Sequence, residues 1–203
     1  MNEVMGSPSI GTVLAAELPL YEQLQQSYKI IKKQHKNWHD TLSAAHKAVM
    51  CLQNVVEQYH CCAQVSIEDT PFRPFVGIQE ALLGKLIQTV EAEMLQIREA
   101  LHELGKTSSA VMKQVNYCLQ SYNKNLTGSS VAAMTVCQPL RPSIAVLLEK
   151  ITDAGHLFHT QYMCKKYYIE NVAYNDVATA ECLANNWLDT KTLDKQITGK
   201  SMA

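Results

Sequence analysis

A heptad-like repeat of apolar residues near the start of the chain restricts the folds that are open to it. The repeat advances by alternating steps of four and three residues, and His35 is its one polar member. Its positions are Leu24, Tyr28, Ile31, His35, Trp38, Leu42, Ala45, Val49, Leu52, Val56 and Tyr59. This spacing lines one side of an α-helix and does not match the two-residue period of a β-strand. The repeat predicts one long helix over about 19–65, with Pro19 in its first turn and the polar run 66–71 after its end.

Two further stretches carry the same four-three spacing. The second repeat predicts a helix over about 77–122; its positions are Met94, Ile97, Leu101, Leu104, Ser108, Val111, Val115, Cys118 and Tyr122. The third predicts a helix over about 143–174; its positions are Ile144, Leu148, Ile151, Gly155, Phe158, Tyr162, Lys165, Ile169 and Val172. Ser143 is a suitable N-cap for the third helix, and Asp176 for a short helix over 176–188. Gly105 lowers the local helix propensity by about 1 kcal/mol relative to alanine, which indicates a kink or a close helix crossing.

The three apolar stripes are each too narrow to stabilise an isolated helix, so they must be buried against one another. We therefore predict an all-α fold, an elongated antiparallel bundle of three long heptad-patterned helices plus a short C-terminal helix. The predicted domain covers 19–188. A flexible extension is expected at 1–18, a loop at 123–142 and a flexible tail at 189–203, since these segments lose the periodicity and contain helix breakers or polar residues.

Composition narrows the functional classes. The 203 residues are 47% hydrophobic and 18% charged, enough apolar surface for a folded core. A net charge of −1 gives no overall attraction to nucleic acid or anionic lipid. No apolar run suits a membrane span, and the first residues lack a basic segment followed by an apolar one, so we expect a soluble intracellular protein. Seven cysteines without framework spacing are expected to be reduced.

Two Glu-x-x-His tetrads, Glu57 to His60 and Glu99 to His102, have the spacing that di-iron helical bundles use. In both helices, however, neighbouring apolar residues occupy the inward positions of the repeat. The tetrads therefore fall on the flanks of their helices. We expect no metal, no cofactor and no catalytic residues, and the protein is not expected to be an enzyme.

An aromatic and basic cluster on the third helix is a candidate interface. Tyr162, Tyr167 and Tyr168, with Lys165 and Lys166, cover more than the inward face of that helix, as anchors of a protein interface do. Lys165 lies on the inward stripe, where a charge is costly unless it reaches solvent or a carboxylate. We expect an acidic group of a partner, or the edge of the bundle, to satisfy it.

Three sequence blocks resemble the AIRIM family, the small helical ribosome-maturation factors that associate with AAA+ ATPases. The first block has Gln34-x-x-x-Trp38-x-x-x-Leu42, followed by Leu52-x-Asn54-x-x-Glu57-Gln58; the second is Glu68-Asp69-x-Pro71. The third is Pro142-Ser143-x-Ala145-x-x-Leu148-Glu149, continuing through Tyr162-x-x-Lys165-Lys166-Tyr167 to Trp187. The C-terminal block is also similar to CINP, an apparent relative. The blocks cover most of 20–188, and within 77–122 the similarity is mostly heptad-like.

The resemblance implies a non-enzymatic adaptor in a complex with two related AAA+ ATPases and a CINP-like helical subunit. In that family the complex acts in cytoplasmic maturation of large-ribosomal-subunit precursors and helps release a shuttling assembly factor. It is also linked to protein turnover at replication forks, so cytoplasm and nucleus are both expected locations. Contact with the pre-ribosomal subunit is expected to be indirect, and neither sequence-specific nucleic-acid binding nor a membrane is expected.

The residues that we expect at partner contacts belong to the first and third blocks; they are Trp38, Tyr162, Lys165, Lys166, Tyr167 and Trp187. Two alternatives stay open at this point. One is a metal-binding helical-bundle enzyme that uses Glu57, His60, Glu99 and His102. The other is a structural coiled coil that forms homodimers through the same heptads.

Overall fold

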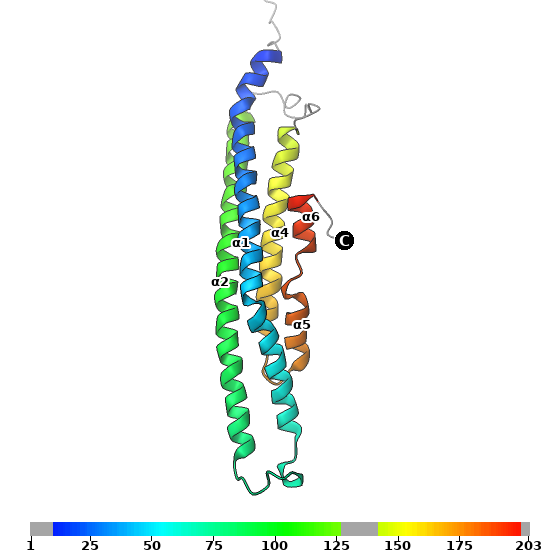
Figure 1. Ribbon diagram of the computed structural model, residues 1–203. Helices are drawn as coiled ribbons and strands as arrows, with labels where there is room; N and C mark the ends of the chain where they lie inside the picture. Colours follow the sequence, from blue (N-terminus) through cyan, green and yellow to red (C-terminus); the bar gives the residue numbers. More distant parts are fainter. Residues whose placement is uncertain (1–9, 127–141, 200–203) are drawn as a thin grey trace, which may run out of the picture. The chain divides into compact units, whose positions relative to one another are not determined.

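The computed structural model describes residues 10–126 and 142–199, and every regular element in these ranges is helical. The elements are α1 (Ile10–Gln64), the short 3-10 helix η1 (Ile67–Asp69), α2 (Ile78–Leu126), α4 (Ile144–Asn171), α5 (Val177–Trp187) and α6 (Lys191–Thr198) (Figure 1). The predicted all-α class, with three long helices, is confirmed. None of the described helices combines the length and the hydropathy that a membrane crossing requires.

The chain forms two compact units, and α1, α2 and α4 contribute residues to both. Of the described residues, 10–35, 109–126, 142–158 and 192–199 make the first unit. Residues 36–108 and 159–191 make the second unit. These ranges include α5 and the connection between α1 and α2.

The core of the first unit follows the predicted repeats. Its buried apolar side chains include Leu24, Ile31, Val111, Val115, Cys118, Ile144, Ile151 and Phe158. Gly155 in α4 allows a close helix contact, because a Cβ there would lie 2.6 Å from the Cγ2 atom of Val115. Leu193 and Ile197 of α6 complete this core.

The second unit has a core of the same kind. Its buried apolar side chains include Trp38, Leu42, Ala45, Val49, Leu52, Val56, Met94, Ile97, Leu104, Ile169, Leu183 and Trp187. Most members of the three predicted repeats are therefore buried, in one unit or the other. Tyr28, His35 and Tyr59 are only partly buried, which fits their polar atoms.

Both predicted helix caps form. The Ser143 hydroxyl accepts a hydrogen bond of 3.2 Å from the backbone N–H of Val146. The Asp176 carboxylate accepts from the N–H groups of Ala178 and Thr179. Each cap satisfies amide donors that the first turn of the helix leaves without a partner inside the helix.

Two of the long helices extend beyond their expected boundaries. Helix α1 begins at Ile10, so Pro19 lies inside it rather than in its first turn. Proline has no N–H, so the helix continues past it with one backbone hydrogen bond fewer. Helix α2 extends to Leu126, four residues past the expected end at Tyr122. The rest of the predicted loop 123–142 lies almost wholly outside the described residues, as do 1–9 of the predicted N-terminal extension.

The expectation of a flexible tail after 188 is wrong for 191–198, which form α6. The segment is polar apart from Leu193 and Ile197, and their spacing of four residues puts both on one face of the helix, where they are buried. Two apolar residues are too few to stand out as a periodic pattern. Residues 200–203 of the predicted tail lie outside the described part.

Candidate partner-binding surfaces

Trp187 of α5 and Trp38 of α1 both lie in the core of the second unit and are fully buried. The indole Nε1 of Trp187 donates a hydrogen bond of 2.9 Å to the carbonyl oxygen of Leu42. Packing within the chain therefore accounts for both tryptophans, which were expected at partner contacts.

Lys165 is also buried, with 1% of its surface exposed, and its partners come from its own chain. Its Nζ donates to Gln161 Oε1 at 3.2 Å and to the carbonyl oxygens of Asn186 and Asp189, each at 3.4 Å. These carbonyls lie at the C-terminal end of α5, where the helix leaves acceptors unsatisfied and its dipole favours a cation. The charge, which was expected to be satisfied by a partner's acidic group or at the edge of the bundle, is thus accommodated by polar groups of the second unit itself.

Burial changes the proton affinity of this lysine. Loss of solvation lowers the pKa of Lys165 from 10.5 to about 8, while the nearby charge of Asp189 acts in the opposite direction. The ammonium form still predominates at neutral pH, because the lowered pKa remains above 7.

Tyr162 packs against α2 at Gly105. A Cβ at Gly105 would lie 3.1 Å from the Cε2 atom of the Tyr162 ring. The glycine inside the second repeat therefore marks a close contact, one of the two possibilities that the sequence indicated. Tyr162 is half-buried by this packing.

Tyr167 and Lys166 remain as candidates on the outer side of α4. Tyr167 is 64% exposed, and its ring centroid lies 6.0 Å from that of Tyr168. Lys166 forms an ion pair of 3.7 Å with Glu170. An open hollow of about 370 Å³ adjoins them, lined by His159, Thr160, Met163, Cys164, Tyr167 and Tyr168. We call these six residues with Lys166 the α4 face; an exposed aromatic beside a mobile thioether suits a protein contact.

The two Glu-x-x-His tetrads do not come together. Glu57 accepts a hydrogen bond from Gln53, and the exposed His60 lies beside Gln64 on its own helix. Glu99 and His102 are exposed on α2 and line an open hollow of about 840 Å³. Among the described residues, the four side chains form no cluster of metal-ligand atoms. The six cysteines within the described ranges are all free thiols.

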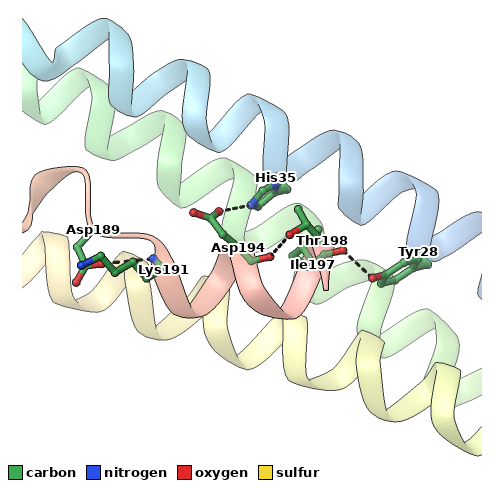
Figure 2. Close-up of polar contacts among 7 residues, drawn as sticks. All are labelled: Tyr28, His35, Asp189, Lys191, Asp194, Ile197 and Thr198. Carbon is green, nitrogen blue, oxygen red and sulfur yellow. Dashed lines mark hydrogen bonds and ion pairs between the residues drawn. The ribbon is translucent and has the colours of Figure 1, made fainter. Parts of the chain in front are cut away.

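Sequence reasoning missed the role of His35, the polar member of the first repeat. In the first unit its Nε2 atom lies 2.6 Å from Oδ1 of Asp194 in α6 (Figure 2). Nearby, the Tyr28 hydroxyl donates to the carbonyl oxygen of Ile197 at 2.9 Å. A polar residue in an apolar stripe was the available signal, since such a residue requires a partner.

Sequence reasoning also missed exposed apolar residues in the connection between α1 and α2. Phe72, Phe75 and Val76 are 53%, 61% and 100% exposed. Two aromatic residues within a short proline-containing turn were the signal, because such a turn cannot bury both.

Comparison with known proteins places most of the chain in one family. The family model described as "Ribosome biogenesis protein C1orf109-like" matches residues 19–200. Three similar proteins each carry the name "AFG2-interacting ribosome maturation factor". The Xenopus tropicalis protein is 26% identical over 85% of this chain and 84% of its own length. The Mus musculus protein is 24% identical over 84% of this chain and 79% of its own length. The Danio rerio protein is 24% identical over 88% of this chain and 88% of its own length. This chain belongs to the C1orf109-like family of ribosome biogenesis proteins.

Proposed function

We propose that this chain is a ribosome maturation factor that acts by binding an AFG2-type AAA ATPase. The observation that carries the proposal is the extent of the match, which covers 84–88% of this chain and 79–88% of relatives named for both properties. A match over nearly the whole length supports a shared architecture rather than one shared motif. The finer proposal is that the chain acts in cytoplasmic maturation of large-subunit precursors and in release of a shuttling assembly factor.

Within this proposal the chain is an adaptor without catalytic activity of its own, and the ATPases hydrolyse ATP. The arrangement of its side chains supports this assignment. The buried lysine is used to hold the end of α5, and the Glu-x-x-His residues lie apart on exposed or half-exposed positions. What the described surface offers is exposed aromatic side chains, which suit binding.

The proposed partners are two related AAA ATPases and a CINP-like helical subunit, and the α4 face is the proposed contact with that subunit. Tyr167 is exposed there beside Met163 and a hollow, so a helix of a partner could cover it. A location in both cytoplasm and nucleus, and a second role in protein turnover at replication forks, belong to the same proposal, since one adaptor surface would serve both.

Affinity capture of the tagged full-length chain from native extract, followed by mass spectrometry, tests the proposal. We expect an AFG2-type ATPase and a second small helical subunit among the bound proteins. Depletion should leave large-subunit precursors in the cytoplasm with their shuttling factor still bound, and the wild-type chain should restore release. A chain that captures no ATPase and sediments as a stable homodimer would contradict the proposal.

A further inference from the structure

The end of the α1–α2 hairpin, in the second unit, has no core of its own. Val56 of α1 and Val90 of α2 are buried, but none of the 33 residues between them is. The stretch is nevertheless rich in apolar side chains: Val65, Ile67, Phe72, Phe75, Val76, Ile78, Leu82, Leu83, Leu86 and Ile87. Each of these side chains is exposed or only partly buried. An apolar segment of this size that is so incompletely covered marks a protein contact more often than a free surface.

The connection at this end, residues 65–80, which we call the hairpin tip, has a defined conformation. Backbone hydrogen bonds join Thr70 to Ile67, Arg73 to Thr70 and Phe75 to Phe72. The Gln79 side chain donates to the carbonyl oxygens of Cys62 and Val65, at 2.8 and 2.9 Å, and so ties α2 to the end of α1.

Two prolines and one glycine shape the backbone of the tip further. Pro71 and Pro74 hold φ near −65°. Gly77 has φ of +79°, a value that glycine adopts at little cost, and the chain turns there into α2. The tip is therefore ordered before any partner binds, which reduces the entropy that binding would cost.

The ordered tip presents its largest apolar side chains to solvent. Phe72, Phe75 and Val76 are more than half exposed, and an open hollow of about 380 Å³ adjoins Phe75 and Val76. Aromatic side chains on a rigid turn are typical anchors of a protein interface, where a few residues supply most of the affinity.

Charge indicates what kind of surface the tip would meet. The tip carries three exposed carboxylates, Glu68, Asp69 and Glu80, against one cation, Arg73. Two such tips would repel each other, and an anionic membrane would repel the tip as well. An apolar groove bordered by lysine or arginine is the complementary surface.

We propose that the hairpin tip is the element that docks onto the AFG2-type ATPase, with Phe72, Phe75 and Val76 entering an apolar groove that has a basic border. The assignment rests on the proposed function and adds the surface that performs it. It also separates two interfaces, because the α4 face is proposed to bind the helical subunit.

The test compares full-length variants for binding to the purified AFG2-type ATPase of the same organism. In the first variant Phe72→Ser and Phe75→Ser are combined; the matched control is Tyr117→Ser, which removes a 54% exposed aromatic from α2 in the first unit. We expect the double variant to raise Kd at least tenfold and the control to leave it within twofold. Replacing Glu68 and Asp69 together by lysine should also weaken binding, and more so at low salt.

Each outcome decides between the two proposals. Binding of the wild-type chain with an unchanged Kd for the double variant overturns the docking assignment alone. A wild-type chain that does not bind the ATPase overturns the proposed function, and the assignment with it. A wild-type dimer that the double variant abolishes, with ATPase affinity unchanged, would assign the tip to a second copy instead.

Hydrogen exchange keeps the assignment testable if the double variant does not fold. In the wild-type complex, backbone amides within 66–80 should become protected on addition of the ATPase, while those of 109–125 should not. Unchanged exchange across the tip in a formed complex would overturn the assignment.

Discussion

The indole Nε1 of Trp187 lies 2.9 Å from the carbonyl oxygen of Leu42, a hydrogen bond between residues 145 positions apart. Both residues are buried in the second unit, so the bond attaches α5 to α1 in a place that water does not reach. A buried donor in an apolar site requires such an acceptor. The contact therefore fixes the position of the short helix as well as contributing apolar burial.

Replacing Trp187 should show both contributions. Trp187→Phe removes the donor and part of the ring, and we expect a loss of about 1–2 kcal/mol in the free energy of unfolding. Trp187→Ala should cost about 3–5 kcal/mol, because it also leaves a large cavity. Urea unfolding followed by circular dichroism measures both. Leu188→Ala, at a half-exposed neighbour, is the control and should change stability by less than about 0.5 kcal/mol.

Lys165 should make stability depend on alkaline pH. Its pKa is about 8 in the folded chain against an ordinary value of 10.5, so the unfolded chain binds more protons between these two values. Stability should therefore rise with pH through this window, by roughly 2 kcal/mol between pH 7 and pH 10.

The variant Lys165→Met cannot titrate at this position and isolates the effect from other groups that lose protons in the same window. The measured quantity is the wild-type free energy of unfolding minus that of the variant, obtained by urea titration at several pH values. A difference that stays flat from pH 7 to pH 10 would show that the ammonium is solvated in the folded chain.

The pair His35–Asp194 should hold α6 in place in the first unit. Asp194→Ala removes the carboxylate whose Oδ1 atom lies 2.6 Å from Nε2 of His35, and with it the polar contact between α6 and α1. We expect a loss of about 1–3 kcal/mol and faster hydrogen exchange of the amides in 192–198. Lys195→Ala, at an exposed position of the same helix, should leave this exchange unchanged. Equal exchange in both variants would mean that Leu193 and Ile197 suffice to dock the helix.

Two glycines inside helices should respond to alanine in opposite directions. Gly155→Ala would place a Cβ 2.6 Å from Val115 and 3.1 Å from the Met112 sulfur, and we expect a loss of about 1–3 kcal/mol from overpacking. Gly84→Ala in α2 meets no atom within 4 Å, so the gain in helix propensity should stabilise the chain by about 1 kcal/mol. Thermal unfolding of the two variants should shift Tm downwards and upwards, respectively.

Tyr167 should matter for binding and not for folding. Because its ring is 64% exposed, Tyr167→Ala should change the free energy of unfolding by less than about 0.5 kcal/mol. Capture of the second helical subunit from extract should fall, whereas Tyr117→Ala should capture it normally. Equal capture by both variants would remove the α4 face from the proposed interface.

Much of the local structure was predictable, because helix periodicity and capping depend on residues within a few positions of one another. The repeats through Leu24, Met94 and Ile144 predict the long helices, and residue type and position predict Ser143 and Asp176 as the caps that their hydrogen bonds confirm. Of the six candidate contact residues, Trp38, Lys165 and Trp187 are buried, and Tyr162 packs against Gly105. Only Lys166 and Tyr167 remain accessible to a partner. An inward tryptophan of a bundle and an anchor of an interface have the same sequence pattern, so the sequence could not separate them.

The sequence by itself determined the all-α class, the apolar stripes and the helix caps, since each depends on backbone geometry that repeats every 3.6 residues. Only the tertiary structure decided how the polar residues in those stripes are satisfied. Lys165 uses carbonyls 21 and 24 positions away, and His35 uses a carboxylate 159 positions away. The tertiary structure also decided that the tip around Phe72 and Phe75 has no cover. Which helix covers an apolar residue depends on packing between segments far apart in the sequence, so a local sequence pattern cannot predict it.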